Sequence, residues 1–339
     1  MPPTAQVAKA SSAALSSTAG LALARRLAPV LLFSDNEPFL PSHLGVSILD
    51  VPGRSPSAPL DITFEPGVER VIEYAIWWDW DVQHLYELEH VWLKLDGADR
   101  IVGVEASAHG GKFAMTGPDG TLPLVDGRVT LVSTPGKHAF TATPAQQDNT
   151  RELTEICCAE LAGRGGLLIN DMFRDAIGPV SAADHRAVKR YLQARAFAPV
   201  FRFGQSVDLA TLEMVSWEDL AAWIPGRVRD ILAEIRAEQP LLKAVFLDSG
   251  DTLVDEGTEV FDDDGYVIEA NLIPGALEMV EALTAEGYRL ALVADGRVRS
   301  FETILGGHGI HPHFEVKVIS EAEGCQKPDR RMFEAALTS

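Results

Sequence analysis

The sequence has few cysteines, no long apolar run and a shortage of positive charge. Three of its 339 residues are cysteine, and two of these, Cys157 and Cys158, are adjacent. Three cysteines do not make a disulfide framework, and this usage suits a reducing compartment. Arg25 and Arg26 interrupt the only N-terminal apolar stretch, and no uninterrupted run could span a bilayer. We therefore expect a cytoplasmic protein with no membrane span and no secretory signal.

Acidic residues outnumber basic ones by 49 to 29, which gives a formal net charge of −20. This balance argues against nucleic acid or an anionic membrane as a partner, because both require basic patches. Nine carboxylates and no lysine or arginine fall between Asp248 and Glu269. Such a run is typical of a solvated loop, although it also attracts divalent cations.

The pattern of residues predicts a multi-domain chain, long enough for two cores. Residues 1–27 begin rich in Ala, Ser and Thr and are expected to form a disordered tail, with a frayed helix as the alternative for residues 1–24. Residues 28–205 carry short alternating runs broken by Pro, Gly and Asp, which predicts a β-sandwich with helical additions and a strand at 197–203. Residues 206–240 are expected to be a helical linker, with a capping box at 216–219. Residues 241–339 alternate strand and helix patterns, as in an α/β Rossmann-like domain.

Reactive residue types follow the predicted strands of this last domain. The run 245–247 ends at Asp248, the run 288–294 ends at Asp295, and Lys327 follows the run 316–319. Ligands bind at the carboxyl ends of strands in α/β sheets, and a carboxylate held there can attack phosphorus to form an acyl-phosphate.

These three segments, in this order, resemble the motifs of the haloacid dehalogenase (HAD) superfamily, the first of which is written D-x-D-x-T. The resemblance implies a Mg²⁺-dependent phosphohydrolase in which Asp248 is both nucleophile and metal ligand. Thr252 would orient the loop, and Asp295 with Gly296 would bind the substrate. The resemblance also implies that Lys327 neutralises both the nucleophile and the transferring phosphoryl group.

The sequence departs from the family pattern at three places. Gly250 occupies the position of the second aspartate, the general acid/base, so that Asp251 would be a poor substitute. Ala294 replaces a hydroxyl-bearing residue of the second motif. The fourth motif, whose paired acidic residues complete the Mg²⁺ site, is missing from residues 241–339. We therefore expect a domain that is either truncated or decayed and that has a low affinity for Mg²⁺. The gaps between the motifs are too short for a cap domain, although residues 261–268 predict a β-hairpin flap with an Asp-Gly turn.

The sandwich region holds the densest set of potential metal ligands. Six of them fall within twelve residues: Asp79, Asp81, His84, Glu87, Glu89 and His90. Glu87 and Glu89 would share one face of a strand, and His84 would fold over from the preceding loop. A histidine with two or three carboxylates suits a divalent ion of hard or borderline character.

Residues 84–91, 107–111 and 136–140 resemble the necrosis-inducing protein family, and related vacuolar-sorting-associated β-sandwich proteins share the pattern. That family carries a G-H-R-H-D-W-E heptapeptide, and His84, Glu87 and Glu89 reproduce the spacing of its metal ligands. The resemblance implies that Asp79 or Asp81 is a further ligand and that His109 lines the site. Cytolytic activity is not expected, because the toxin members of the family are secreted.

Three interpretations follow. The first is a HAD-type hydrolase of phosphomonoesters, small or protein-borne, that uses Mg²⁺. The second is a binding protein whose sandwich holds a second divalent cation and a glycan or lipid headgroup, with the HAD-like half as a non-catalytic scaffold. The third is that the sequence is a fragment of a longer active enzyme. The identity of the substrate and the oligomeric state do not follow from the sequence.

Overall fold

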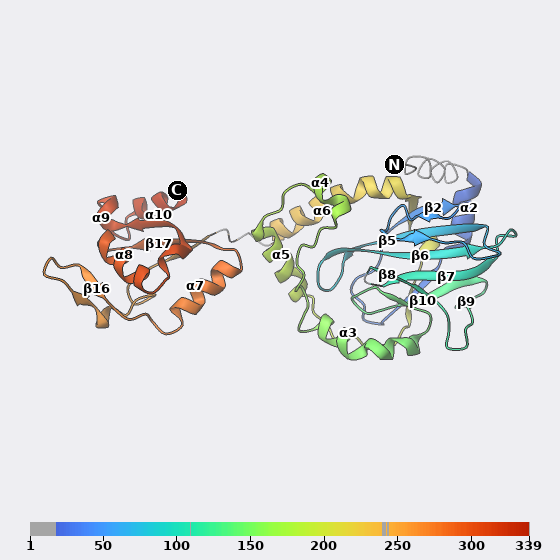
Figure 1. Cartoon of the computed structure of the whole chain (residues 1–339), viewed down its shortest axis with the longest axis horizontal. Helices are drawn as coiled ribbons and strands as arrows, with labels where there is room; N and C mark the ends of the chain where they lie inside the picture. The colour runs from blue at the N-terminus through green and yellow to red at the C-terminus, as the bar shows by residue number, and fades with distance from the viewer. Residues whose placement is uncertain (1–17, 109, 239–241, 243, 339) are drawn as a thin grey trace. The chain divides into compact units, whose positions relative to one another are not determined.

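The computed structural model describes residues 18–108, 110–238, 242 and 244–338. The chain forms two compact units, both drawn in Figure 1. Unit 1 comprises Met1–Pro179 and Ala187–Gln239, and unit 2 comprises Val180–Arg186 and Pro240–Ser339. Within the described residues, no helix is both long and apolar enough to cross a membrane.

Unit 1 is built on two β-sheets. The first has the strand order β11-β10-β1-β12, with β9 beside β10, and the second has the order β13-β2-β5-β6-β7-β8. The strands of the first sheet are β1 (Val30–Phe33), β9 (Leu124–Val125), β10 (Arg128–Ser133), β11 (Phe140–Thr141) and β12 (Gln205–Asp208). Those of the second are β2 (His43–Leu49), β5 (Arg70–Trp80), β6 (Leu85–Leu95), β7 (Ile101–Ala108), β8 (Gly111–Ala114) and β13 (Glu213–Ser216). A separate short pair joins β3 (Gly53–Arg54) to β4 (Asp61–Ile62).

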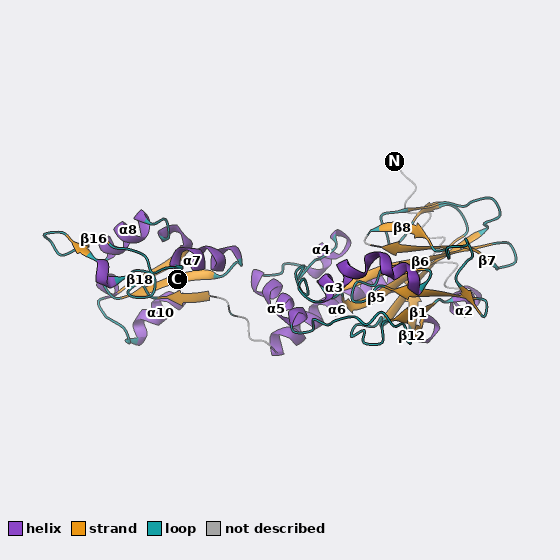
Figure 2. Cartoon of the chain, turned by 90° about the horizontal axis from the view of Figure 1, so that it is seen from below, coloured by secondary structure: helices purple, strands orange, loops and turns teal. Residues whose placement is uncertain are grey.

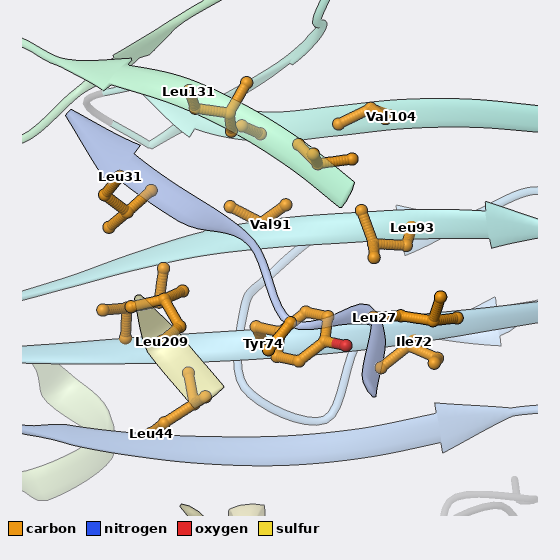
Figure 3. Close-up of a cluster of buried hydrophobic side chains, with 14 of the residues drawn as sticks. Leu27, Leu31, Leu44, Ile72, Tyr74, Val91, Leu93, Val104, Leu131 and Leu209 are labelled. Atoms are coloured by element: carbon orange, nitrogen blue, oxygen red, sulfur yellow. The ribbon is translucent and has the colours of Figure 1, made fainter. Parts of the chain in front are cut away.

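The apolar faces of the two sheets enclose one core. Figure 3 shows Leu31 of β1 and Leu131 of β10 in one cluster with Tyr74 of β5 and with Val91 and Leu93 of β6. These positions alternate with outward-facing ones along each strand, which is the pattern that predicts a sandwich. The β-sandwich expected for this part of the chain is confirmed.

The prediction of a disordered tail is wrong for residues 18–27, which form helix α2 (Thr18–Leu27). Ala24 and Leu27 are buried in the sandwich core. The hydroxyl of Tyr74 donates a hydrogen bond of 2.8 Å to the carbonyl oxygen of Ala24, which fixes the helix to β5. Residues 1–17, the rest of the expected tail, lie outside the described residues.

The prediction of a helical linker at 206–240 is also wrong in part. Its first residues form β12, which pairs with β1, and β13, which pairs with β2. Helix α6 (Trp217–Glu238) follows as expected, and the amide of Asp219 donates to Ser216 Oγ at 3.0 Å at its start. The helix packs on β2 and therefore belongs to unit 1. The strand expected at 197–203 does not form, because Phe201 has a φ of 49° that interrupts an extended chain.

Further helices complete unit 1. They are α3 (Arg151–Cys158), α4 (Asp171–Ile177), α5 (Ala182–Gln193) and the 3₁₀ turns η1 (Pro144–Thr150) and η2 (Leu209–Thr211). The first residues of α5 belong to unit 2.

Unit 2 contains a parallel sheet with the order β14-β17-β18, flanked by helices on both faces. The sheet consists of β14 (Ala244–Leu247), β17 (Arg289–Ala294) and β18 (Phe314–Ile319). Its helices are α7 (Ala276–Ala285), α8 (Val298–Gly307), α9 (Ser320–Glu323) and α10 (Arg330–Thr338). The remaining elements are η3 (Glu256–Thr258), the hairpin strands β15 (Val260–Phe261) and β16 (Val267–Glu269), and η4 (His311–His313).

Strand β17 shows why helices cover both faces of this sheet. Its residues Leu290 and Leu292 pack in a cluster with α7 and α8, whereas Ala291 and Val293 pack with Met332 of α10. Figure 2 shows α7 and α8 on one side of this sheet and α10 on the other. The α/β fold is therefore confirmed, and the described residues between the motifs contain no separate cap domain.

Candidate active site

The structure brings the ends of the three predicted strands of unit 2 together. Asp248 follows β14, Asp295 follows β17, and Lys327 comes after β18 and α9. The ammonium nitrogen of Lys327 lies 2.5 Å from Asp248 Oδ2. The backbone amide of Lys327 donates to Asp295 Oδ1 at 3.0 Å. The three motifs therefore meet at the carboxyl edge of the sheet, where ligands bind in open α/β folds.

A tight loop holds Asp248 at this edge. The amide of Ser249 donates to Asp248 Oδ1 at 2.8 Å, and the carbonyl of Ser249 accepts from the amides of Leu253 and Val254 at 2.8 and 2.9 Å. Asp251 adopts a φ of 50°, which lets the chain reverse. Asp248 Oδ1 thus accepts from a backbone amide and Oδ2 faces the Lys327 ammonium group, while 44% of the Asp248 side chain stays accessible to a ligand. Thr252, expected to orient the loop, is exposed.

A cavity of about 280 Å³ opens beside this loop, with Gly250, Asp295 and Gly296 in its wall. Its apolar side is formed by Phe261, Val267, Phe301 and Ile304, and its charged side by Glu256, Glu259 and Arg297. Burial raises the pKa of Glu259, and the negative charges of Glu256 and Asp251 raise it further.

The expected hairpin flap borders the same cavity. Strands β15 and β16 pair in an antiparallel manner, and Asp262 Oδ1 accepts from the amides of Asp264 and Tyr266 at 3.0 and 2.8 Å. Arg297 Nη1 donates to the carbonyl of Asp264 at 2.8 Å, and the amide of Val267 donates to Ser300 Oγ at 3.0 Å. These contacts hold the flap against the start of α8.

Sequence reasoning did not identify several residues of this site. Ser320 Oγ accepts from the amide of Gly296 at 2.9 Å, and Glu321 Oε2 accepts from the amide of Val298 at 2.9 Å, so both fix the loop after β17. Glu256 and Glu259 belong to the acidic run that the sequence assigned to a solvated loop. The property of that run that could have identified Glu256 and Glu259 in the sequence is its capacity to attract cations.

The described residues around Asp248 offer Mg²⁺ few ligands. In the part of the chain that the structure describes, the group of three His, Cys, Asp or Glu with all ligand atoms within 4.8 Å of one another is Asp81, His84 and Glu87, in unit 1. Mg²⁺ at Asp248 would therefore depend on substrate phosphate and water for most of its octahedral shell. We expect weak binding in the absence of a phosphate.

The predicted ligand cluster of the sandwich is brought together only in part. His84 Nε2 lies 3.8 Å from Asp81 Oδ1 and 3.7 Å from Glu87 Oε2. Asp79, the alternative to Asp81, instead pairs with Arg227 at 2.7 Å. Glu89 stands outside this group of three among the described residues and accepts a hydrogen bond from Ser107 Oγ. His109 lies outside the described residues.

The ammonium group of Lys137 competes for the most buried member of this cluster. Lys137 Nζ lies 2.7 Å from Asp81 Oδ2, and the Asp81 side chain is fully buried. Burial by itself would raise the pKa of Asp81, but the charges of His84, Lys137 and His138 lower it overall. A cavity of about 550 Å³, lined in part by His84, Glu87, Glu89 and His90, adjoins the cluster.

Comparison with known proteins agrees with the geometry of unit 2. Residues 174–339 match the haloacid dehalogenase-like hydrolase family. Over this segment the chain is similar to that family. The match begins ahead of the boundary expected at residue 241 and includes α5 and α6, whereas the compact HAD-like unit comprises Pro240–Ser339 with Val180–Arg186.

Curated relatives cover a shorter segment. Haloacid dehalogenase-like hydrolase domain-containing protein 3 of Homo sapiens is 34% identical over 79 residues, which is 23% of this chain and 31% of the human protein. The protein of the same name from Mus musculus gives the same values. The chain thus covers about a third of the length of these relatives.

Solved structures of NLPPya are also among the matches. NLPPya in complex with glucosamine aligns with a TM-score of 0.26 at 20% identity, covering 36% of this chain and 66% of that chain. A mutant form of NLPPya aligns with a TM-score of 0.27 at 20% identity, covering 38% of this chain and 69% of that chain.

Proposed function

We propose that the HAD-like unit hydrolyses phosphomonoesters with Asp248 as the nucleophile. The supporting observation is the 2.5 Å contact between Lys327 and Asp248 at the carboxyl edge of the sheet. A lysine in this position offsets the charge of an incoming phosphate. The apolar and charged walls of the 280 Å³ cavity beside the loop suit the alcohol part of a small ester.

The reaction has two chemical steps. A carboxylate oxygen of Asp248 attacks phosphorus, the bond to the alcohol oxygen breaks, and that oxygen takes a proton from water or from an acid in the site. Water then attacks the acyl-phosphate, loses a proton, and releases phosphate while the Asp248 carboxylate is restored. Lys327 balances charge throughout, and the amides that hold the loop keep Asp248 in place. Bound Mg²⁺ would add a Lewis acid that polarises the phosphoryl oxygens.

The test is hydrolysis of p-nitrophenyl phosphate by the purified chain and by an Asp248→Asn variant, each with and without Mg²⁺. We expect turnover that rises with Mg²⁺ and drops at least about 100-fold in the variant. Asp175→Asn, which makes the same charge change at an exposed position of α4, is the matched control and should keep full activity. Equal rates for wild type and Asp248→Asn would refute the proposal.

A second candidate function is binding of a divalent cation and a polar ligand, such as a glycan or lipid headgroup, by the sandwich. The observation that favours it is the Asp81–His84–Glu87 group beside a 550 Å³ cavity. Calorimetric titration with Mn²⁺ and Zn²⁺ tests it, with Glu87→Gln as the variant that removes one charged ligand. Unchanged heats in Glu87→Gln would exclude this group as the binding site.

A further inference from the structure

The cavity beside Asp248 contains a carboxylate that replaces the side chain missing at Gly250. A Cβ atom built on Gly250 would lie 1.8 Å from Glu256 Oε1 and 2.7 Å from Glu256 Cδ. All three of the nearest atoms to that Cβ belong to Glu256. The Glu256 carboxylate, delivered by η3, therefore occupies the space that an acidic side chain at position 250 would fill.

The structure also shows what holds Glu256 there. The backbone amide of Glu256 donates to Asp251 Oδ1 at 3.3 Å, and Asp255 caps the turn by accepting from the amide of Gly257 at 3.0 Å. Asp251 is therefore turned toward the backbone of η3, and it is not among the residues that line the cavity. Its position suits support of Glu256 better than proton transfer to a bound ester.

We propose that Glu256 is the general acid and base of the phosphoryl transfer. In the first step the Glu256 carboxylic acid gives its proton to the alcohol oxygen as the bond between phosphorus and that oxygen breaks. In the second step the Glu256 carboxylate takes a proton from the attacking water as the bond between phosphorus and Asp248 breaks. Proton and charge balance are thus restored after each cycle.

The surroundings of Glu256 fit this role. Glu256 and Glu259 line the same small cavity, and Glu256 is exposed, so a bound ester can reach its carboxylate. The raised pKa of Glu259, caused by burial and then by the charge of Glu256, is a further sign that these groups interact. Asp295, the other carboxylate in the wall, is already engaged by the amide of Lys327.

This inference rests on the proposed function, and the test separates the two. Two substrates are compared: glycerol 2-phosphate, whose alkoxide must be protonated to leave, and p-nitrophenyl phosphate, whose leaving phenolate is stable without a proton. In Glu256→Ala we expect kcat for glycerol 2-phosphate to fall about 100-fold and kcat for p-nitrophenyl phosphate to fall less than about tenfold. Glu281→Ala, at an exposed position of α7, is the control.

A double variant tests the position directly. Gly250→Asp combined with Glu256→Ala places a carboxylate in the space that Glu256 vacates, and the φ of Gly250 lies outside the left-handed range that would strain aspartate. We expect kcat of the double variant for glycerol 2-phosphate to be at least about tenfold higher than that of Glu256→Ala. In Gly250→Asp alone the new side chain meets the Glu256 carboxylate, so we expect no increase in kcat over wild type.

The possible outcomes are distinct. If turnover depends on Asp248 but Glu256→Ala slows both substrates equally, the role of Glu256 is overturned and the nucleophile stands. If wild type and Asp248→Asn are equally inactive on both substrates, the proposed function and this inference are both wrong.

Discussion

At the scale of single residues, Lys137 controls the net charge of the Asp81–His84–Glu87 cluster in the sandwich. Its ammonium group lies 2.7 Å from Asp81 and thereby neutralises the buried member of the Asp81–His84–Glu87 group. A divalent cation at the proposed site would have to displace this charge to bind Asp81, so we expect the lysine to lower the affinity of the cluster for metal. The same contact stabilises the metal-free protein, because a buried carboxylate without a partner is costly.

We predict that Lys137→Met raises the affinity of the sandwich for Zn²⁺ or Mn²⁺ by about tenfold, or ~1.4 kcal/mol. Without metal the variant should lose about 3 kcal/mol of stability, and saturating metal should restore part of the loss. Calorimetric titration and thermal unfolding with and without metal measure both effects. Lys112→Met, which removes a lysine paired with Glu105 instead, is the control. A Lys137→Met protein that neither binds metal nor gains stability from it would show that the cluster is a structural ion network.

His90 makes the stability of the sandwich depend on pH. Its side chain is buried against the ring of Trp92, and burial lowers its pKa from 6.5, against the opposing effects of the Glu73 charge and the Ser57 backbone. The unfolded chain therefore binds the proton more readily than the folded chain. Stability is complete above pH 6.5 and falls as the pH drops below that value.

We predict a loss of up to about 1.4 kcal/mol of unfolding free energy per pH unit below this point, and a flatter profile in His90→Phe. Urea unfolding at pH 7.5, 6.0 and 5.0, followed by tryptophan fluorescence, measures the slope. His313→Phe in η4 of unit 2 should leave it unchanged. An identical slope in wild type and His90→Phe would assign the pH dependence to other groups.

At the scale of elements, the parts that sequence predicts are those set by local pattern. The spacing of Leu277, Val280 and Leu283 indicates a helix, and α7 contains all three. The 216–219 box predicts the start of α6, and the hydrogen bond at Ser216 caps it. Strand-end residues such as Asp248 are likewise visible in the sequence, because a buried run followed by an acidic turn needs no knowledge of the rest of the fold.

The parts that sequence reasoning missed depend on contacts formed only in the folded chain. In the sequence, helix α2 reads as part of a tail that begins rich in Ala, Ser and Thr. Only the folded chain shows that Tyr74, 50 residues further on, donates a hydrogen bond to the Ala24 carbonyl. Glu256 looks like one acid of a solvated run until η3 turns it into the space above Gly250. The Lys137–Asp81 pair joins residues 56 apart, and no periodic pattern marks it.

The docking of α2 gives a prediction at this scale. Tyr74→Phe removes the 2.8 Å hydrogen bond to Ala24 and leaves a buried carbonyl without that donor, so we expect a loss of about 1 kcal/mol. Since Arg25 and Arg26 lie at the end of α2, trypsin should cleave there faster in the variant. Tyr266→Phe in unit 2 serves as the control. Unchanged stability and cleavage would mean that burial of Ala24 and Leu27 alone fixes the helix.

At the scale of the whole molecule, each unit has its own core and its own spectroscopic or exchange signal. All six tryptophans belong to unit 1, so their fluorescence reports on the sandwich alone. Hydrogen exchange in peptides from residues 276–338 reports on unit 2. The two signals allow the stability of each unit to be followed in the intact chain.

Two core variants test whether the units fold independently. Glu73 accepts hydrogen bonds from Ser55 and Trp92 at 2.6 and 2.7 Å, so Glu73→Ala leaves buried donors unpaired and should cost about 3 kcal/mol in unit 1. Met332 is fully buried in unit 2, where Met332→Ala should cost about 3 kcal/mol by opening a cavity.

We expect Glu73→Ala to shift the fluorescence transition in urea and leave exchange of residues 276–338 unchanged, and Met332→Ala to do the reverse. The separate contact networks of the two units predict this result, because a local loss of packing lowers the stability only of the unit that contains that core. If either variant shifts both signals to the same extent, the chain unfolds as one cooperative body. Activity lost in a sandwich variant would then report on stability rather than on the chemistry at Asp248.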